Sequence, residues 1–273
     1  MLKADMGLNV DEDHIATDLH NRGYAVFDFP DANISSKIDR IRQRLSPRRG
    51  IDFVDPASDG RIQDAWTFDE DVGAIATNAS VLEPLSRLCG RRTFPFQTLN
   101  FPVGTQQAVH LDSVHFSSLP KRFMCSVWLA MEDIGVDQAP LLYLPGSYKW
   151  PIVTNALMGR RGAGSELVSA QDSYGPAWDA LCDAYGTSEE TFLGGSTQAN
   201  PTLTRWSQVT RYYFEDCIYY TPAFSDEALG QLDLRNLISI EDGKLRLDNC
   251  QGEPIVQPAP PSFPRRVLRA LKR

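Results

Sequence analysis

The stretch Gln107-Ala-Val-His110-Leu-Asp112-Ser-Val-His115-Phe116 is the part of the sequence that most constrains the fold. His110 and Asp112 are separated within it by one residue. Side chains two positions apart on a β-strand point to the same side, so a strand here would present an imidazole and a carboxylate together. The stretch therefore indicates a strand that carries half of a metal site.

Two histidines and a carboxylate form the facial triad that holds non-haem Fe(II) and leaves other coordination positions open. A third ligand must come from a short list, because the chain has only four histidines: His14, His20, His110 and His115. His115 is the nearest, but at five residues from His110 it would face the other side of a regular strand. A His-x-Asp pattern also occurs as an ordinary polar pair at a strand end, without a metal.

Several apolar runs predict the strands of a sheet. Residues 123–131 have the length and composition of a buried strand, and residues 139–148 form a second run that ends in a Pro-Gly turn. Residues 205–220 are rich in β-branched and aromatic side chains, which favour strands. Residues 24–29 also have the pattern of a strand.

Three helices are predicted from apolar spacing and end signals. The first begins near Asp11, with acidic residues in its first turn and Gly23 after its end. The second has an apolar stripe from Ile34 and runs to about Arg44. The third covers residues 176–185 between breakers.

The order of these segments resembles the phytanoyl-CoA dioxygenase (PhyH) family of Fe(II)- and 2-oxoglutarate-dependent oxygenases. The residues that carry the resemblance are Phe94-Pro-Phe-Gln97-Thr-Leu-Asn100-Phe101, His110-x-Asp112, Trp128-Leu-Ala-Met-Glu-Asp133, Pro145-Gly-Ser-Tyr148 and Thr204-Arg205-Trp-Ser-Gln-Val-Thr210. The similarity extends from about Gly23 to Phe224, which is most of the chain. Its specificity lies in the order and spacing of the pieces together.

The resemblance implies a mainly β (α+β) fold, a double-stranded β-helix of the jelly-roll or cupin-like kind with flanking N-terminal helices. It implies His110 and Asp112 as catalytic iron ligands. Arg205 stands where the family has an arginine that binds the far carboxylate of 2-oxoglutarate, a task that suits a planar guanidinium. The implied cofactors are Fe(II), 2-oxoglutarate and O2, and the implied reaction hydroxylates a small-molecule metabolite. Arg205 as a structural salt-bridge partner is the alternative.

Three further positions resemble the family's cosubstrate pocket. Gln97 and Asn100 match polar positions that line it, although both could simply cap strand edges. Trp128 matches an aromatic residue beside the cosubstrate, although a tryptophan in an apolar strand is first of all a core residue. Arg211 is interpreted as a solvated strand residue.

The sequence departs from the family pattern at Leu193. The family has a distal histidine followed by two glycines and a serine, whereas this chain has Leu193-Gly194-Gly-Ser196. Residues 184–192 are polar and turn-rich where the family has an apolar strand, so a core strand and its turn, on the order of 10 to 20 residues, are missing before Gly194. Three explanations stay open: an inactive pseudo-enzyme that binds small molecules or acts as a scaffold, a deletion variant of an active parent, or an enzyme whose third ligand comes from elsewhere, such as His115.

Composition limits the other possibilities. With 273 residues and 42% apolar content, the chain can form one substantial domain, placed at residues 1–250. A net charge of -8 argues against nucleic acid as a partner. Five scattered cysteines fit a reducing compartment. The sequence has no apolar stretch of membrane-spanning length and no signal-peptide core, so a cytoplasmic location is expected.

The C-terminal part has a different character. Five prolines between Pro254 and Pro264 predict an extended linker over residues 251–264. Residues 265–273 form a basic tail with a small apolar edge, which could touch an anionic surface or remain solvated.

Overall fold

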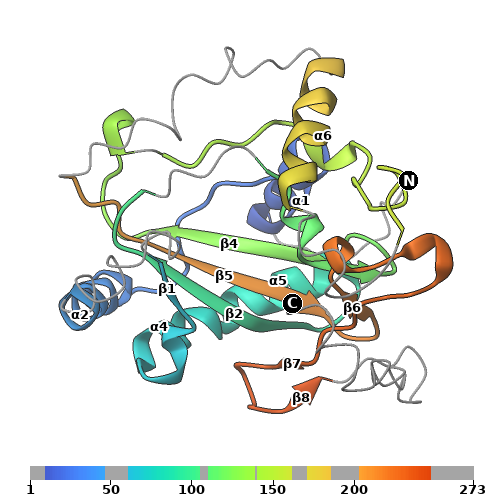
Figure 1. The fold of residues 1–273 in the computed structure, drawn as a ribbon. Coiled ribbons are helices and arrows are strands. Elements are labelled where there is room, and N and C mark those ends of the chain that lie inside the picture. The colour runs from blue at the N-terminus through green and yellow to red at the C-terminus, as the bar shows by residue number, and fades with distance from the viewer. Residues whose placement is uncertain are drawn as a thin grey trace, which may run out of the picture.

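The computed structural model describes residues 10–46, 61–104, 110–138, 140–161, 171–185 and 203–246. Its centre is a four-stranded antiparallel sheet in the order β1-β2-β5-β4 (Figure 1). These strands are β1 (Ile62–Gln63), β2 (Thr93–Phe101), β4 (Met124–Ala130) and β5 (Ser207–Phe214). Two small antiparallel sheets pair β3 (Ser117–Leu119) with β6 (Ile218–Tyr220), and β7 (Leu237–Ile238) with β8 (Leu245–Arg246).

Helices cover the central sheet. They are α1 (Val10–Arg22), α2 (Ile34–Leu45), α4 (Glu70–Ala76), α5 (Ala79–Cys89) and α6 (Gln171–Ala184). Short 3-10 turns span Ala65–Thr67, Asp112–Val114, Val136–Gln138, Ser147–Lys149, Pro222–Phe224 and Glu227–Leu229. In Figure 1, α2 and α4 lie below the sheet and α6 stands above it.

The two faces of β5 have different environments. Gln208 and Tyr212 point to the helical side: the Gln208 amide donates to the Val72 carbonyl (3.2 Å) and the Tyr212 hydroxyl to the Ala76 carbonyl (3.2 Å). Apolar side chains of α2, α4 and the strands fill this side, and the largest cluster comprises Ile41, Leu45, Ile62, Ala65, Val72, Ile75, Met131 and Trp206. Because strand residues alternate between faces, Arg211 points to the opposite side, where the candidate site lies.

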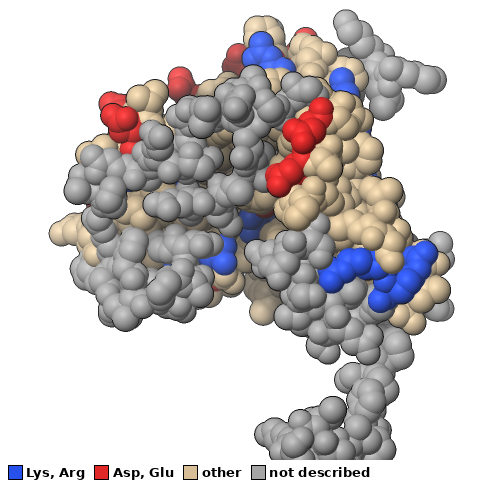
Figure 2. All heavy atoms as spheres, turned by 45° about the horizontal axis from the view of Figure 1, so that its top comes forward, with Lys and Arg blue, Asp and Glu red and all other residues tan. Residues whose placement is uncertain are grey.

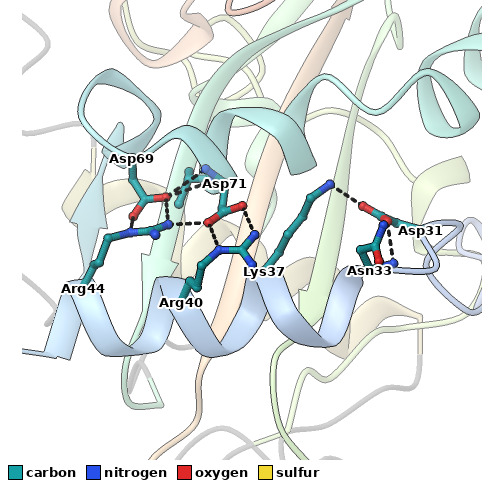
Figure 3. Close-up of polar contacts among 8 residues, drawn as sticks. Asp31, Asn33, Lys37, Arg40, Arg44, Asp69 and Asp71 are labelled. Atoms are coloured by element: carbon teal, nitrogen blue, oxygen red, sulfur yellow. Dashed lines mark hydrogen bonds and ion pairs between the residues drawn. The ribbon is translucent and has the colours of Figure 1, made fainter.

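A charged network joins α2 to the start of α4 (Figure 3). Asp69 caps α4 by accepting hydrogen bonds from the backbone N–H groups of Asp71 and Val72, both at 3.1 Å. Arg44 binds Asp69 through two bonds of 2.7 and 2.8 Å, and Arg40 binds Asp71 through bonds of 2.9 and 2.6 Å. The two carboxylates are buried and the arginines are partly exposed. The network therefore supplies the counter-charge that burial of the carboxylates requires.

This network predicts an acid-dependent contribution to stability. The hydrogen bond from Arg40 lowers the pKa of Asp71, burial opposes this, and Arg44 adds to it, so the pKa falls from 3.8 to about 2. The contribution is complete above the unfolded pKa and is lost as the pH falls through the folded pKa. Asp71→Asn should lower the free energy of unfolding at pH 7 by about 1–3 kcal/mol. It should also flatten the dependence of stability on pH between about 4 and 2.

Urea denaturation at several pH values measures both effects. Asp242→Asn is the comparison, because the Asp242 side chain is more exposed than that of Asp71 and its partner Arg246 lies only four residues away along the chain. Such pairs contribute little to stability. An Asp71→Asn protein with the pH dependence of the wild type would show that the network does not act as described.

Two predicted strands do not form. Residues 24–29 have no strand, and Val26 is 85% exposed. Residues 140–146 are irregular and lead into a 3-10 turn. Pro140 and Pro145 have no N–H group to donate, which disfavours a place within a sheet. Residues near this segment instead donate hydrogen bonds to carbonyl groups at the C-terminal end of α1. The Gly146 N–H donates to the Arg22 carbonyl (2.7 Å), and the Tyr148 hydroxyl donates to the His20 carbonyl.

The remaining predictions about architecture have mixed outcomes. Strands over 123–131 and 205–220 and all three predicted helices are confirmed. The described residues form antiparallel sheets and helices in an α+β arrangement and contain no closed barrel. Leu193, Gly194, the proposed linker and the basic tail lie outside the described residues.

Two smaller observations concern thiols and membranes. The four cysteines in the described segments, Cys89, Cys125, Cys182 and Cys217, form no disulfide with one another. None of the helices in those segments has the length and apolar character needed to cross a bilayer.

Candidate metal and cosubstrate site

His110 and Asp112 lie together, although their segment is not a strand. His110 is in irregular backbone and Asp112 begins the 3-10 turn Asp112–Val114. The His110 Nε2 atom lies 3.6 Å from the Asp112 Oδ1 atom, and the side chains are 49% and 34% exposed. Nitrogen and oxygen ligands lie about 2.0–2.2 Å from a first-row metal, so two atoms at this separation can bind one ion. The pair fits a chelating role.

The turn is held between the central sheet and α6. Val114 packs with Val153, Ala223 and Tyr174 of α6. Beneath the turn, Arg211 of β5 donates from Nη2 to Asp112 Oδ1 at 3.1 Å. The site therefore lies on the face of the sheet opposite α4.

Asp112 is held in its ionised form. Burial alone would raise its pKa, but the hydrogen bond with His110 and the charge of Arg211 outweigh burial and lower the pKa to about 2. The carboxylate is therefore available as an anionic ligand at neutral pH.

Arg211 is not a solvated strand residue, so that interpretation was wrong. Its side chain is 13% exposed, and its guanidinium carbon lies 4.2 Å from the centroid of the Phe116 ring. Its Nη1 atom donates to Gln97 Oε1 at 2.7 Å, and the two residues are direct partners in the β2–β5 ladder. Gln97 thus faces the site and reaches Asp112 through Arg211.

His115 does not complete the metal site. Its backbone N–H donates to the Asp112 carbonyl (3.0 Å) at the end of the 3-10 turn, so the parity of a regular strand does not apply to it. Burial lowers its pKa, which favours a neutral imidazole. Within the described segments, however, no three His, Cys, Asp or Glu residues cluster closely enough to hold a metal ion.

Arg205 and Trp128 form the second part of the site. Arg205 is 6% exposed, and its guanidinium carbon lies 5.4 Å from the centroid of the Trp128 ring. Its Nε atom has no hydrogen-bond partner among the described residues. Burial is the cause of its lowered pKa, with no carboxylate identified as a compensating charge. The structural salt bridge considered as an alternative is therefore not found in this part of the chain.

Asn100 lies away from this site. It is completely buried and its amide donates to Gln208 Oε1 (3.2 Å) on the helical face of the sheet. Asn100 stands three residues from Gln97, and residues an odd number apart on a strand face opposite sides. The structure therefore does not bring Asn100 to the pocket.

Arg205 lies two residues before the start of β5, and Arg211 lies within this strand. The two arginines are six residues apart, a distance of about 20 Å in extended backbone. Figure 2 brings the top of Figure 1 forward and shows Lys or Arg atoms near the centre of this face.

Comparisons with known proteins give one informative match. The family model described as "Phytanoyl-CoA dioxygenase (PhyH)" matches residues 28–179, more than half of the 273-residue chain. The matched range includes His110, Asp112 and Trp128 and ends before Arg205. No curated protein matches the sequence significantly.

Two similar solved structures belong to one protein. The first is the "non-heme alpha ketoglutarate dependent epimerase SnoN from nogalamycin biosynthesis", with 16% identity, a TM-score of 0.49 and coverage of 77% of this chain and 85% of that chain. The second is the same epimerase in complex with Fe3+, alpha ketoglutarate and nogalamycin RO, with 15% identity, a TM-score of 0.46 and coverage of 77% and 86%. Likenesses this distant carry no argument about the reaction of this chain.

Proposed function

The chain belongs to the phytanoyl-CoA dioxygenase family, and from this premise we propose that it is an Fe(II)- and 2-oxoglutarate-dependent oxygenase that acts on a small-molecule metabolite. His110 and Asp112 would bind the iron, and Arg205 would bind the far carboxylate of 2-oxoglutarate. The antiparallel sheets would belong to a double-stranded β-helix. The observation that carries the proposal is the buried Arg205 guanidinium, whose Nε has no partner among the described residues.

A buried guanidinium without a counter-charge is costly for a protein. A ligand carboxylate would remove that cost, because its two oxygens match the two-pronged geometry of arginine. Trp128 lies against the guanidinium and forms an apolar wall beside this position. A dicarboxylate such as 2-oxoglutarate could bind Arg205 at one end and reach toward the His110–Asp112 pair at the other.

The positions of these residues indicate the role that each would have in the reaction. When bound, iron and 2-oxoglutarate would supply the oxidising chemistry, in which O2 and 2-oxoglutarate become carbon dioxide and succinate while the substrate is hydroxylated. His110 and Asp112 provide a neutral and an anionic donor on one side of the metal position. Arg205 orients the cosubstrate, and the wall formed by Trp128 limits access of water to its carboxylate.

Replacing Arg205 with methionine tests the proposal. Arg205→Met keeps a long apolar side chain but removes every donor, so we expect 2-oxoglutarate to bind about 100-fold more weakly in the presence of metal. Metal binding alone should change little. Isothermal titration under nitrogen, with Mn(II) as an inert substitute for Fe(II), measures both affinities.

Arg246→Met is a matched control. Its guanidinium also lies over an aromatic ring, Phe94, at 5.3 Å, and its Nε also has no partner in the described segments. It belongs to β8 and pairs with Asp242 rather than approaching the site. Equal 2-oxoglutarate affinity in Arg205→Met and the wild type would assign Arg205 a structural role only.

A second candidate function is a non-catalytic protein that binds a small molecule at Arg205. Leu193 stands where the family pattern has the third iron ligand, and the described segments contain no three-residue metal cluster. Such a protein would bind 2-oxoglutarate or a similar dicarboxylate through Arg205 with equal affinity whether metal is present or absent. It would form no succinate.

A further inference from the structure

The Asp112 carboxylate belongs to a turn outside the central sheet, yet it is tied to the sheet by Arg211. We propose that Arg211 is the positioning residue of the metal site: one arm of its guanidinium fixes Asp112, and Gln97 fixes the other arm. This inference rests on the proposed function, because a positioning role has meaning only if Asp112 binds a metal. It assigns a task to a residue that the proposed function does not use.

Asp112 needs such support because of its backbone. A ligand on a strand is held by ladder hydrogen bonds on both sides, whereas Asp112 begins a single 3-10 turn closed by bonds from His115 and Phe116. Within the described residues, Arg211 is the only residue of the central sheet that bonds to the Asp112 carboxylate. The guanidinium is therefore the contact that relates the carboxylate to β2 and β5.

Arg211 is itself held in place from two directions. Nη1 donates to Gln97 Oε1 at 2.7 Å across a registered pair of strand residues. The guanidinium lies over Phe116 at 4.2 Å, which restricts its movement. A lysine could carry the same charge, but it could not bond to Gln97 and Asp112 with a fixed planar fork.

The charge of Arg211 and its positioning of Asp112 are expected to have opposite effects on the affinity for a metal ion. A bound cation would be repelled by the guanidinium, whereas a correctly oriented carboxylate would bind it more tightly. An ionised carboxylate offers about four lone-pair positions, so one bond from Arg211 leaves others for a metal. A positioning role therefore predicts weaker metal binding when Arg211 is lost, and a purely repulsive role predicts tighter binding.

Co(II) titration of the full chain under nitrogen provides the test, because the absorption bands of Co(II) report its coordination as well as its affinity. Outer-shell partners of metal ligands are typically worth about 10–100-fold in affinity. We expect Arg211→Met to lose affinity in this range and to shift the absorption bands. Gln97→Leu should lose less, and the double variant should lose no more than Arg211→Met, because both residues act through one contact.

Arg235→Met is the matched control. The Arg235 guanidinium lies over the same Phe116 ring at 4.6 Å but donates to the His115 carbonyl (3.3 Å) and Thr221 Oγ1 (3.2 Å) rather than to Asp112. Its loss should affect packing around the ring to a similar extent. We expect Co(II) affinity and absorption bands close to those of the wild type.

The possible results distinguish failure of the positioning role of Arg211 from failure of the proposed function. If the wild type binds Co(II) and Arg211→Met binds it equally well or more tightly, the positioning role is overturned and the proposed function stands. If Arg235→Met loses as much affinity as Arg211→Met, packing of Phe116 is responsible and the inference also fails. If the wild type binds no Co(II) at millimolar concentration, the proposed function fails and the positioning role fails with it.

Discussion

Asp112→Asn is expected to abolish tight binding of divalent metal and to weaken metal-dependent binding of 2-oxoglutarate with it. The loss should exceed about 100-fold, because even residues that only support metal ligands contribute up to that amount. Asparagine keeps the size of the side chain and an oxygen that can accept the bond from Arg211, so the fold should be preserved. Titration with Fe(II) under nitrogen, with circular dichroism to check folding, measures the result.

Asp233→Asn is the control for this substitution. Asp233 is also a partly buried carboxyl near an arginine, Arg235, and its pKa is raised by burial rather than lowered. Its neighbours are Thr221 and Arg235. If the Asp112→Asn protein binds Fe(II) as tightly as the wild type, Asp112 is not a metal ligand.

Leu193→His is expected to have the largest effect in the other direction. A third protein ligand should tighten Fe(II) binding by roughly 10–1,000-fold, because the two-histidine, one-carboxylate set is the arrangement that retains this metal. The prediction rests on the sequence pattern before Gly194 alone, since Leu193 lies outside the described residues. The Leu193→His substitution distinguishes a chain that has lost only the histidine side chain from one that has lost the whole strand that should carry this ligand.

Thr191→His provides the control for position. It adds the same imidazole two residues earlier, where the family pattern has no ligand. If Leu193→His and Thr191→His bind Fe(II) equally, any gain comes from an extra imidazole rather than from a restored site. If neither changes the affinity, side-chain replacement does not restore the site, and a missing strand or an inactive scaffold becomes the better explanation.

Much of the central sheet could be predicted because its strands have a strong local signal. Residues 123–131 and 205–220 are apolar, β-branched or aromatic over a strand length, and they form β4, β5 and β6. Residues 24–29 have a similar composition but no strand partner. Strand formation depends on pairing with a distant segment, which local composition does not determine.

The helices α4 and α5 are not predicted from apolar periodicity, although other signals for them are present. Asp69 and Asn78 cap their starts, and Gly90 adopts a left-handed conformation (φ 63°) at the end of α5. Pro84 lies within α5, which makes the segment resemble a loop. Cap residues were therefore the more informative signal.

The sequence predicts which residues form the candidate site better than it predicts how the backbone arranges them. His110 and Asp112 lie together as expected, but a 3-10 turn rather than a strand places them. Strand parity separates Asn100 from Gln97 within β2, so this placement could have been inferred from the sequence. The contact between Arg211 and Asp112 could not, because it joins residues 99 positions apart.

The central claim is that this chain binds Fe(II) and 2-oxoglutarate together at His110, Asp112 and Arg205. Its most direct test is titration of the wild-type protein with both under nitrogen, followed by admission of air and measurement of succinate. The account predicts that each ligand increases the affinity for the other and that succinate forms in air. Independent binding of 2-oxoglutarate without Fe(II) uptake at millimolar concentration, and no succinate, would contradict it.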